Sequence, residues 1–398
     1  MSVTLIVGDL HLGKGVGIGK PGVGSSLNSR VVDQLCLLDW VLDRAIEVNA
    51  GAIILAGDIC EDIKPDYVLI ELFVEWLKRC SVHYIEVHII AGNHDLKRTG
   101  ARFSSYLDLI TTVDLPDIHV YTNTNTIFRD GVGFTLLPFR DRQALGAATN
   151  EEALDKVAAQ LPYEVEGIPN DYQRVLVGHL ALAGSIFVGD EFDNLARELM
   201  CPLEMFAGYD YVWMGHVHKP QVMQKSPHIA HIGSLDISDF GETDHKKIIV
   251  VFDTELPDKF YEIEVPSRPL RRVVVDVPDG FDSTSYVINK IQAMEKKSSF
   301  DKAIVRVEVK LLDEDTTNVD RDTISEVIYD LGAFYVCPIQ ESRNISVVSV
   351  IQQQAIDNKI APKAAIKVYA DTQEFGSDQV KQRFIDKAGE FVDRHYAK

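Results

Sequence analysis

The chain has few cysteines and no long hydrophobic run. It carries 5 cysteines in 398 residues, an odd number, scattered and without a C-x-x-C pair. This pattern argues against a disulfide framework and a thiolate zinc site, so we expect the cysteines to be core residues. No apolar run approaches the roughly 18 residues that a membrane-spanning helix needs, and the first residues lack the basic segment and cleavage site of a secretory signal. We therefore expect a cytoplasmic protein with no membrane span.

Basic residues are outnumbered by acidic ones. The chain has 60 Asp and Glu against 40 Lys and Arg, for a formal net charge of −20. This balance argues against a protein whose whole surface binds nucleic acid. It leaves room for a local binding site, because metal ions add positive charge where the chemistry takes place.

Short apolar runs alternate with helix-length amphipathic stretches in the first part of the chain. Buried strands are predicted at VTLIV (3–7), AIILA (52–56), IEVHIIA (85–91), RVLV (174–177) and DYVWM (210–214), with helices near 28–49, 65–80 and 150–160. Such alternation predicts an α/β fold in which sheets are layered with helices. The stretches HIAHIGSL, KKIIVVFDT and KFYEIEV follow as closely spaced strands and indicate an antiparallel return.

A change of pattern near Pro266 predicts a domain boundary. A chain of 398 residues is too long for one ordinary core, and VPSRPLRR is typical of a linker. The strand-like and helix-like stretches after it predict a small α+β module. We predict domains at 1–265, 266–342 and 343–398, the last with a helix over 377–396 that Ser377 caps. This helix either docks on a partner or packs on its own domain.

Each early strand ends in glycine, or glycine and asparagine, followed by side chains that can bind a metal. The stretches are VGDLH, AGDICED, AGNHD, VGHL and MGHVH. Glycine lets the backbone turn sharply, and open α/β sheets place their sites at the carboxyl ends of strands. Alternation on extended backbone also places the two histidines of the last stretch on one side. Five such elements predict one shared site with the candidates Asp9, His11, Asp58, Asn93, His94, His179, His216 and His218.

The donor set indicates the chemistry. Imidazoles and carboxylates without a thiolate suit manganese, iron or zinc. Two cations about 3.5–4 Å apart, as in two-metal phosphoesterases, need a ligand that touches both. Asp58 is the bridging candidate, because it is the lone carboxylate at its strand end.

Over residues 3–218 this motif series resembles, in order, that of the calcineurin-like metallophosphoesterases. The resemblance implies a layered α/β/β/α sandwich with two divalent metal ions. It implies that one metal is held by Asp9, His11, Asp58 and His218, and the other by Asp58, Asn93, His179 and His216. His94 matches the family's non-ligand histidine, which steadies the scissile phosphate and assists proton transfer to the leaving oxygen. Glu61 stands where many relatives carry an aspartate, and we expect its effect to be indirect.

The stretch HIGSLDISDFGETDHKK (231–247) is similar to the segment after the last metal motif in SbcD-type DNA repair exonucleases. That family's order of nuclease, capping domain and ATPase-docking region also fits the predicted domains. The leading hypothesis is therefore a manganese-dependent DNA nuclease of this type, an exonuclease or endonuclease in DNA repair or recombination. The resemblance implies DNA and an SbcC-type coiled-coil SMC-like ATPase as partners. It also implies a homodimer formed by the predicted helices at 65–80 and 102–110.

Two other hypotheses remain. One is a phosphomonoesterase or small-nucleotide phosphodiesterase of the same fold, which the net charge of −20 favours. The other is a scaffold that has lost catalysis, which the intact ligand set argues against.

A glycine-rich stretch, GIGKPG (17–22), lies near the first motif. Pro21 inside the turn argues against a dinucleotide site. Lys14, Lys20 and Arg30 either contact DNA phosphates from a loop at the mouth of the metal site or belong to a solvated loop. Arg140 and Arg142, in PFRDR, are either further backbone contacts or surface ion-pairing residues.

Overall fold

The computed structural model describes residues 3–24, 26–99, 102–113, 115–189, 199–312, 319–344, 366–367, 370 and 378–396. The chain divides into two compact units. The first contains 1–271, 300–305 and 332–337, and the second contains 272–299, 306–331 and 338–398.

The first sheet of the first unit has the strand order β14-β13-β1-β2-β3-β6. Its parallel strands are β1 (Val3–Val7), β2 (Ala52–Leu55), β3 (Glu86–Ile90) and β6 (Ile118–Tyr121). The antiparallel strands β13 (Ile248–Asp253) and β14 (Phe260–Glu264) complete it. The strands predicted from 3–7, 52–56 and 85–91 are therefore neighbours, and their carboxyl ends meet at one edge.

The second sheet has the order β11-β12-β10-β9-β8-β7. Its parallel strands are β12 (His228–His231), β10 (Tyr211–Met214), β9 (Gln173–Gly178) and β8 (Val132–Leu137). The antiparallel edge strands are β11 (Gln221–Gln224) and β7 (Asn125–Arg129). The predicted antiparallel return is correct for β13 and β14 but wrong for HIAHIGSL, because β12 pairs with β10 in parallel.

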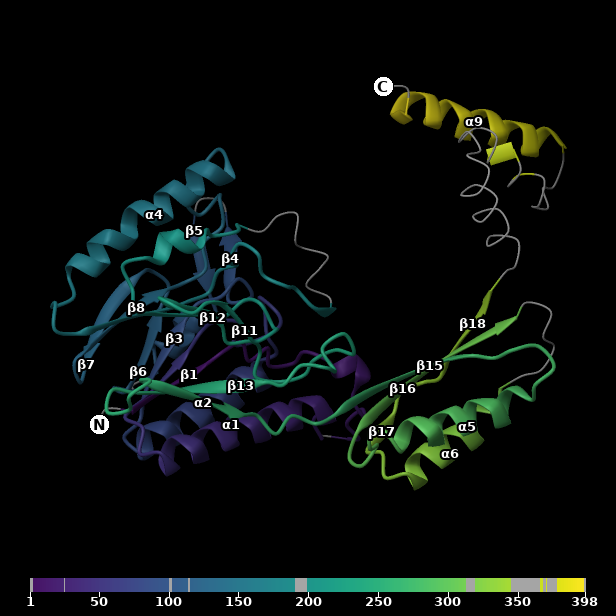
Figure 1. The fold of residues 1–398 in the computed structure, drawn as a ribbon, viewed down its shortest axis with the longest axis horizontal. Coiled ribbons are helices and arrows are strands. Elements are labelled where there is room, and N and C mark those ends of the chain that lie inside the picture. The colour runs from purple at the N-terminus through teal and green to yellow at the C-terminus, as the bar shows by residue number, and fades with distance from the viewer. Residues whose placement is uncertain are drawn as a thin grey trace. The chain divides into compact units, whose positions relative to one another are not determined.

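Helices cover the outer faces of both sheets, as Figure 1 shows. On the first sheet lie α1 (Ser29–Glu47) and α2 (Tyr67–Val82), and on the second lie α4 (Asn150–Glu166) and the short helix η3 (Leu203–Phe206). Asn28, Asp66 and Thr149 each accept a backbone hydrogen bond at the start of α1, α2 and α4. A third apolar cluster, including Ile6, Ile54 and Trp213, fills the space between the sheets. The α/β/β/α prediction is confirmed.

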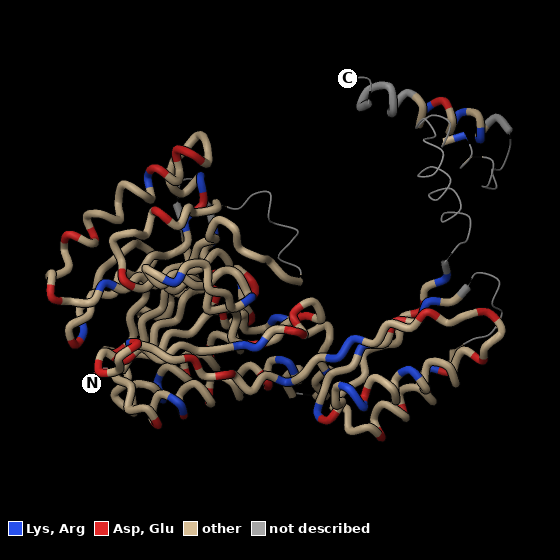
Figure 2. The backbone as a smooth tube through the Cα atoms, in the orientation of Figure 1, with Lys and Arg blue, Asp and Glu red and all other residues tan. Residues whose placement is uncertain are grey.

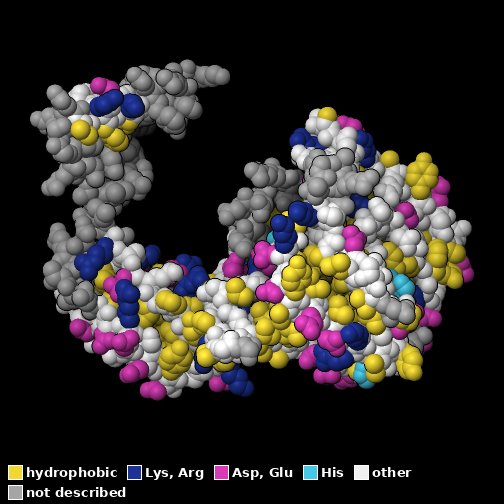
Figure 3. Space-filling model, turned by 180° about the vertical axis from the view of Figure 1, so that it is seen from behind, with side chains coloured by type: hydrophobic (Ala, Val, Ile, Leu, Met, Phe, Trp, Pro, Cys, Tyr) yellow, Lys and Arg dark blue, Asp and Glu magenta, His cyan; other side chains and the backbone are white. Residues whose placement is uncertain are grey.

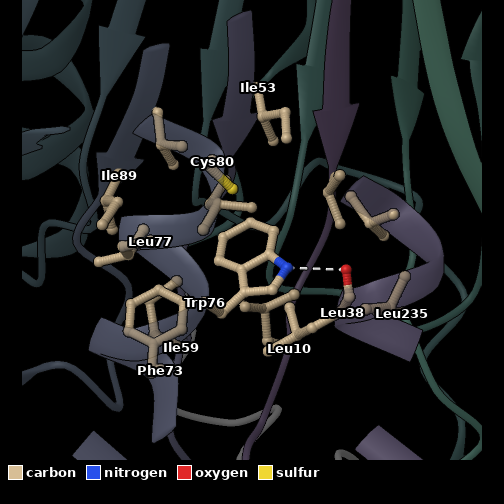
Figure 4. Packing of buried hydrophobic residues seen from close by; sticks show 14 of the residues in the cluster. Leu10, Leu38, Ile53, Ile59, Phe73, Trp76, Leu77, Cys80, Ile89 and Leu235 are labelled. Carbon is tan, nitrogen blue, oxygen red and sulfur yellow. Dashed lines mark hydrogen bonds between the residues drawn. The ribbon is translucent and has the colours of Figure 1, made fainter. Parts of the chain in front are cut away.

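The core between the first sheet and its helices holds the loops that follow the strands. Trp76 of α2 stacks on Phe73 with ring centroids 5.8 Å apart, and its Nε1 donates to the Leu38 carbonyl of α1 at 2.8 Å (Figure 4). Leu10 and Ile59 belong to the same cluster. Leu10 directly follows the predicted ligand Asp9, and Ile59 directly follows Asp58. Packing in this core therefore holds the loops after β1 and β2 in place.

Some predictions require correction. The stretch 102–110 is not one helix, since β4 (Leu96–Thr99) and β5 (Arg102–Ser105) form a hairpin and α3 spans only Leu107–Ile110. Of the five cysteines, Cys36 on α1 is exposed, so the prediction of a core position is wrong for it and confirmed for the others. Within the described ranges, no helix is both long and apolar enough to cross a membrane.

Most of a small α+β arrangement lies in the second unit, and its assignment as a separate domain over 266–342 stays a prediction. Its helices are α5 (Ser283–Glu295) and α6 (Arg321–Asp330), and its sheet is formed by β15 (Leu270–Asp276), β16 (Ile304–Leu312), β17 (Tyr335–Val336) and β18 (Gln340–Asn344). Two short segments near this sheet belong to the first unit: 300–305, which includes the start of β16, and 332–337, which includes β17. Helix α9 spans Asp378–Tyr396, and the predicted cap Ser377 lies outside the described residues.

Candidate metal centre

The seven predicted ligands and the predicted catalytic residue His94 all follow parallel strands at their carboxyl ends. Asp9 and His11 follow β1, Asp58 follows β2, Asn93 and His94 follow β3, His179 follows β9, and His216 and His218 follow β10. The first five residues come from the first sheet and the last three from the second. The structure brings all eight together where the two sheets meet.

The backbone is strained at three of these positions. His11, Asp58 and His216 have φ angles of 46°, 48° and 75°, in the left-handed region that side chains other than glycine seldom adopt. Such conformations persist only where surrounding contacts enforce them, and they concentrate at functional sites.

Two glycines are required by the close approach of ligands. A Cβ on Gly57, whose φ is +104°, would lie 2.3 Å from Nδ1 of His179. A Cβ on Gly215 would lie 2.6 Å from Oδ1 of Asp9. Both distances are far below van der Waals contact, so any side chain there would displace a predicted ligand.

Asp58 lies at the middle of the site. Its Oδ1 accepts the backbone N–H of His94 at 2.8 Å, while its Oδ2 lies 3.2 Å from Nε2 of His179 and 3.5 Å from Nε2 of His11. The described residues form two metal-capable groups, His11–Asp58–His94 and Asp58–His179–His216, each with ligand atoms within 4.8 Å of one another. Asp58 is the member common to both groups, which is the arrangement a bridging ligand needs.

His11 and His218 face each other through the same ring nitrogen. Their Nε2 atoms are 3.0 Å apart. Nδ1 of His218 lies 2.8 Å from Oε1 of Glu242, and Nδ1 of His11 lies 2.7 Å from Oε2 of Glu61, a short contact whose angles fall outside hydrogen-bond geometry. A carboxylate beside Nδ1 favours a proton there, which leaves lone pairs on both Nε2 atoms. Two lone pairs directed at each other fit a shared cation.

The second group has the same excess of acceptors. Nδ1 of His179 lies 2.6 Å from the Ala56 carbonyl, so a neutral ring would present Nε2 as an acceptor to Oδ1 of Asn93 at 3.0 Å. Oδ1 of Asn93 also lies 2.9 Å from Nδ1 of His216. Oδ2 of Asp9 is buried and has no hydrogen-bond partner in the described part of the chain. These converging acceptors fit a divalent cation bound by nitrogen and oxygen donors.

The electrostatics of the site favour positive charge. Although burial opposes ionisation, the charges of Asp58 and Asp9 raise the pKa of His179 well above its usual value. Burial likewise opposes the ionised form of Asp58, yet His179 and His11 hold its pKa well below the usual range. The negative charges of Asp58 and Asp9, which favour a proton on His179, would also attract a bound cation.

Sequence reasoning assigned no role to Glu242 or Lys247. Both are buried, and Oε2 of Glu242 lies 2.8 Å from Nζ of Lys247, which also donates to the His218 carbonyl at 3.0 Å. Burial disfavours the ionised carboxyl, but the hydrogen bond to His218 and the charge of Lys247 hold the pKa of Glu242 well below its usual range. The F-G-E element that carried the family resemblance contains Glu242, and this was the available signal.

Asp95 in the AGNHD stretch serves the loops rather than the metal. Its Oδ1 accepts the backbone N–H of Ile59 at 3.0 Å, and its Oδ2 accepts that of Gly92 at 2.8 Å. The Tyr106 hydroxyl also donates to it. Asp95 thereby ties the loop after β2 to the loop after β3.

The predicted DNA contacts Lys14 and Lys20 lie in different surroundings. Lys14 is buried, and its Nζ lies 3.7 Å from Oε2 of Glu61, beside the metal centre. Lys20 is exposed, and its backbone exchanges hydrogen bonds with Ser29. Only Lys14 is therefore adjacent to the site.

Arg30 differs from the prediction. It is 0% exposed, and its guanidinium donates to Asp33, Asp236 and the Ile237 carbonyl. This enclosure leaves no surface for DNA, because α1 and the segment after β12 cover the side chain. The residue joins these two segments instead.

The chain belongs to the calcineurin-like phosphoesterase family, which matches residues 3–220. The predicted class, a metal-dependent hydrolase of phosphoesters, is thereby confirmed, and the family implies divalent metal ions. The chain is also 25% identical over 295 residues to the SbcD subunit of the nuclease SbcCD from Staphylococcus epidermidis, covering 70% of this chain and 75% of that protein.

Two solved structures are similar at lower levels. A dimetal phosphatase from Danio rerio has 12% identity and a TM-score of 0.39, covering 63% of this chain and 92% of that one. The nuclease MPE of Pseudomonas putida has 16% identity and a TM-score of 0.22, covering 46% and 68%. Neither likeness adds to the argument.

Proposed function

We propose that this chain is a manganese-dependent DNA nuclease that hydrolyses phosphodiesters in DNA repair or recombination. The observation that carries the proposal is the alignment with the SbcD subunit of the nuclease SbcCD. It runs for 295 residues and is therefore longer than the family match over 3–220. The N,O-donor set without thiolates supports manganese among the metals it suits.

The residues of the site have separate roles in this proposal. One ion is held by Asp9, His11, Asp58 and His218, and the other by Asp58, Asn93, His179 and His216. When bound, the pair supplies a Lewis acid that polarises the phosphoryl group and lowers the pKa of water. The chain's own contribution is to fix the donor atoms, with Asp58 shared between the two sets.

His94 is the proposed proton donor to the leaving oxygen. Its Nδ1 bonds to the Glu61 carbonyl and its backbone N–H bonds to Asp58, so the ring orientation is fixed and Nε2 is the nitrogen that can reach substrate. Burial opposes its protonation, but the charges of Asp58 and Glu61 raise the pKa of His94. A raised pKa keeps the acid form available near neutral pH. His94 is close enough to His11 and Asp58 to be counted in one metal-capable group. In this proposal its Nδ1 stays bonded to the Glu61 carbonyl, and its Nε2 serves the substrate instead of a metal ion.

Assembly forms a second part of the proposal. We assign 1–265 to a nuclease domain, 266–342 to a capping domain and 343–398 to a segment that binds an SbcC-type coiled-coil SMC-like ATPase. A homodimer through α2 is supported by the exposure of Tyr67 and Val68, at 84% and 44%, on its first turn. On α9, the exposed Val380 and Phe384 support docking on a partner.

Light scattering and capture test the assembly. Truncation before residue 377 is expected to spare the dimer and the nuclease activity and to abolish capture of the purified ATPase. A monomeric full-length protein sinks the dimer. Undiminished capture by the truncated form sinks the docking helix.

A small-substrate phosphomonoesterase or nucleotide phosphodiesterase is the second candidate. The net charge of −20 favours it. Acidic and basic residues are also interspersed among the described residues of the first unit, along its backbone (Figure 2) and over the face shown in Figure 3.

One experiment separates the two candidates. The full chain with manganese is incubated with labelled linear duplex, single-stranded DNA and bis(p-nitrophenyl) phosphate, with Asp58→Asn as the inactive control. Metal-dependent cleavage of DNA supports the nuclease. Cleavage of the small diester alone supports the second candidate.

A further inference from the structure

A polar pocket of about 370 Å³ lies among the β4–β5 hairpin, α3 and the segments after β6 and β8. Its volume falls in the roughly 300–1,000 Å³ range of small-molecule sites. We call it the Arg140 pocket and define it by Ser104, Ser105, Asp108, Thr122, Asn123 and Arg140, which come from the β4–β5 hairpin, α3 and the segments after β6 and β8.

The chain links this pocket closely to the proposed ligands. Leu96, which also lines it, directly follows Asp95 in the loop after β3. Arg140 directly follows Phe139, whose ring centroid lies 5.9 Å from that of His216. Through Phe139, the segment that carries Arg140 neighbours one of the proposed ligands, His216.

Arg140 is held in place by neutral oxygens alone. Its Nη1 donates to the Phe139 carbonyl at 2.8 Å, and its Nη2 donates to the Thr122 carbonyl at 2.5 Å and to Oδ1 of Asn123 at 3.1 Å. No carboxylate of the described residues forms an ion pair with this guanidinium. Burial lowers the pKa of Arg140.

An oriented guanidinium without a counter-ion indicates an anion site. Removing a cation from water without a partner is unfavourable, so such charges are usually paired. Of the five N–H donors of an arginine, three hydrogen bonds are accounted for, which leaves two for a ligand. The remaining donors are on Nε and Nη1, since both Nη2 hydrogens are engaged. A charged N–H donor binds a phosphate oxygen strongly, and the phosphate supplies the missing charge.

We propose that the Arg140 pocket binds a phosphate group of the substrate next to the one that is hydrolysed. The inference rests on the proposed function, because a polynucleotide carries such a neighbouring phosphate and a simple diester does not. The Ser104 hydroxyl, whose bond to the Lys97 carbonyl is long at 3.4 Å, is a second donor within the pocket. Asp108 opposes the anion and limits its affinity, while its Oδ2 accepts the Ser105 N–H at 3.2 Å.

The first test compares two substrates that differ by one phosphate. Thymidylyl-thymidine has only the scissile diester, and its 5′- or 3′-phosphorylated forms add a neighbour. With manganese, kcat/KM for one phosphorylated form is expected to exceed that of the parent by about tenfold, the size of one charge-assisted hydrogen bond. Arg140→Gln should reduce this ratio towards 1, and Arg140→Lys should retain part of it.

Arg142→Gln is the matched control. Arg142 is exposed, donates to the Ala148 carbonyl and does not line the pocket. It should keep the full ratio. Millimolar inorganic phosphate distinguishes the source of the anion. If the pocket binds free phosphate, the added ion should abolish the kcat/KM ratio between the phosphorylated and parent dinucleotides in the unsubstituted protein. If the pocket needs a phosphate within the nucleic-acid chain, the ratio should remain.

The second test measures binding without catalysis. Thymidine 3′,5′-bisphosphate is titrated calorimetrically into the EDTA-treated full chain. Arg140→Gln should weaken its binding about tenfold, whereas Asp108→Asn, which removes the opposing charge, should strengthen it. Opposite changes in two variants exclude a general loss of folding.

The outcomes separate the two levels of inference. Failure of the parent protein to cleave any diester contradicts the proposed function, and the titration then decides the pocket alone. An unchanged substrate ratio in Arg140→Gln, or unchanged bisphosphate binding, overturns the pocket whatever the activity on DNA.

Discussion

The Nδ1 atom of His218 lies 2.8 Å from Oε1 of Glu242, 24 residues further along the chain. The other oxygen of Glu242 lies 2.8 Å from the ammonium group of the buried Lys247. This relay fixes the imidazole so that its Nε2 faces that of His11 at 3.0 Å. The segment after β12 thus acts on the metal centre without contributing a ligand.

Glu242→Gln should weaken metal binding. The amide keeps the shape and one acceptor but loses the charge that orients and polarises His218. Loss of such an outer partner typically lowers metal affinity about 10–100-fold. Calorimetric titration of the metal-free protein with manganese measures it. Glu264→Gln, at an exposed glutamate on β14, is the matched control, and equal manganese affinity in both variants would contradict the relay.

Asp58→Asn should remove catalysis and reduce bound metal at both positions. The amide offers one oxygen where the carboxylate offers two, and Asp58 belongs to both metal-capable groups. Glu61→Gln should do much less, because Glu61 belongs to neither metal-capable group and contacts His11 at Nδ1, while Asp58 lies at Nε2. Elemental analysis and cleavage assays check both variants. Full metal content in Asp58→Asn removes the bridging assignment.

His94→Ala should lower turnover while metal content stays constant. Proton transfer and positioning by a side chain contribute typically about 10²–10⁴-fold. His216→Ala is the contrasting variant, expected to lose metal as well as activity. If His94→Ala loses as much metal as His216→Ala, then His94 is a ligand and its assigned role is wrong.

Arg30→Gln should destabilise the fold rather than weaken DNA binding. Breaking a buried ion pair by removing one partner typically costs about 3–5 kcal/mol, and Arg30 is fully enclosed beside Asp236. Urea unfolding measures the change. Lys20→Gln, at an exposed position, should leave stability unchanged and flatten the salt dependence of DNA binding by up to about one unit. A stable Arg30→Gln protein with weakened DNA binding would restore the original prediction.

Stability should decrease as the pH falls below about 6.5, in part through His88. Burial, together with the charges of His119 and Arg129, lowers the pKa of His88 to about 3. The unfolded chain therefore binds the proton first, and between pH 6.5 and 3 this histidine removes up to about 1.4 kcal/mol of unfolding free energy per pH unit.

His88→Gln isolates this contribution. Its unfolding free energy, measured by urea titration at several pH values, should fall less steeply with acid than that of the parent chain. His83→Gln, at an exposed histidine, is the control and should follow the parent. Identical slopes for His88→Gln and the parent would disprove the assignment.

The strands, and the meeting of the candidate ligands at one edge, were predictable because both follow local rules. The five strands that carry the candidate ligands are short apolar runs, and each ends in or is closely followed by a glycine and then a polar side chain. His216 and His218 both face the site as predicted, but the predicted reason is wrong: β10 ends at Met214 and His216 has a φ of 75°, so the two histidines lie on a bend and do not alternate on extended backbone.

The residues around the ligands were not predictable, because their roles depend on distant partners. Arg30 is enclosed by Asp236, 206 positions away, and no local pattern signals that contact. Glu242 reaches His218 through a loop without periodicity. The β4–β5 hairpin is short and polar, so the apolar residues near 102–110 favoured a helix instead.

One hydrogen bond connects the two sheets directly at the metal centre. The backbone N–H of His216 donates to Oδ1 of Asp9 at 2.9 Å, so a loop of the second sheet is fastened to a loop of the first. Each proposed ligand set draws on both sheets. If the two sheets separate at this edge, both ligand sets are disrupted together in one cooperative opening. Such an opening would therefore release both ions together. Hydrogen exchange at the His216 amide therefore measures how often the two loops separate, and its rate should fall when manganese binds.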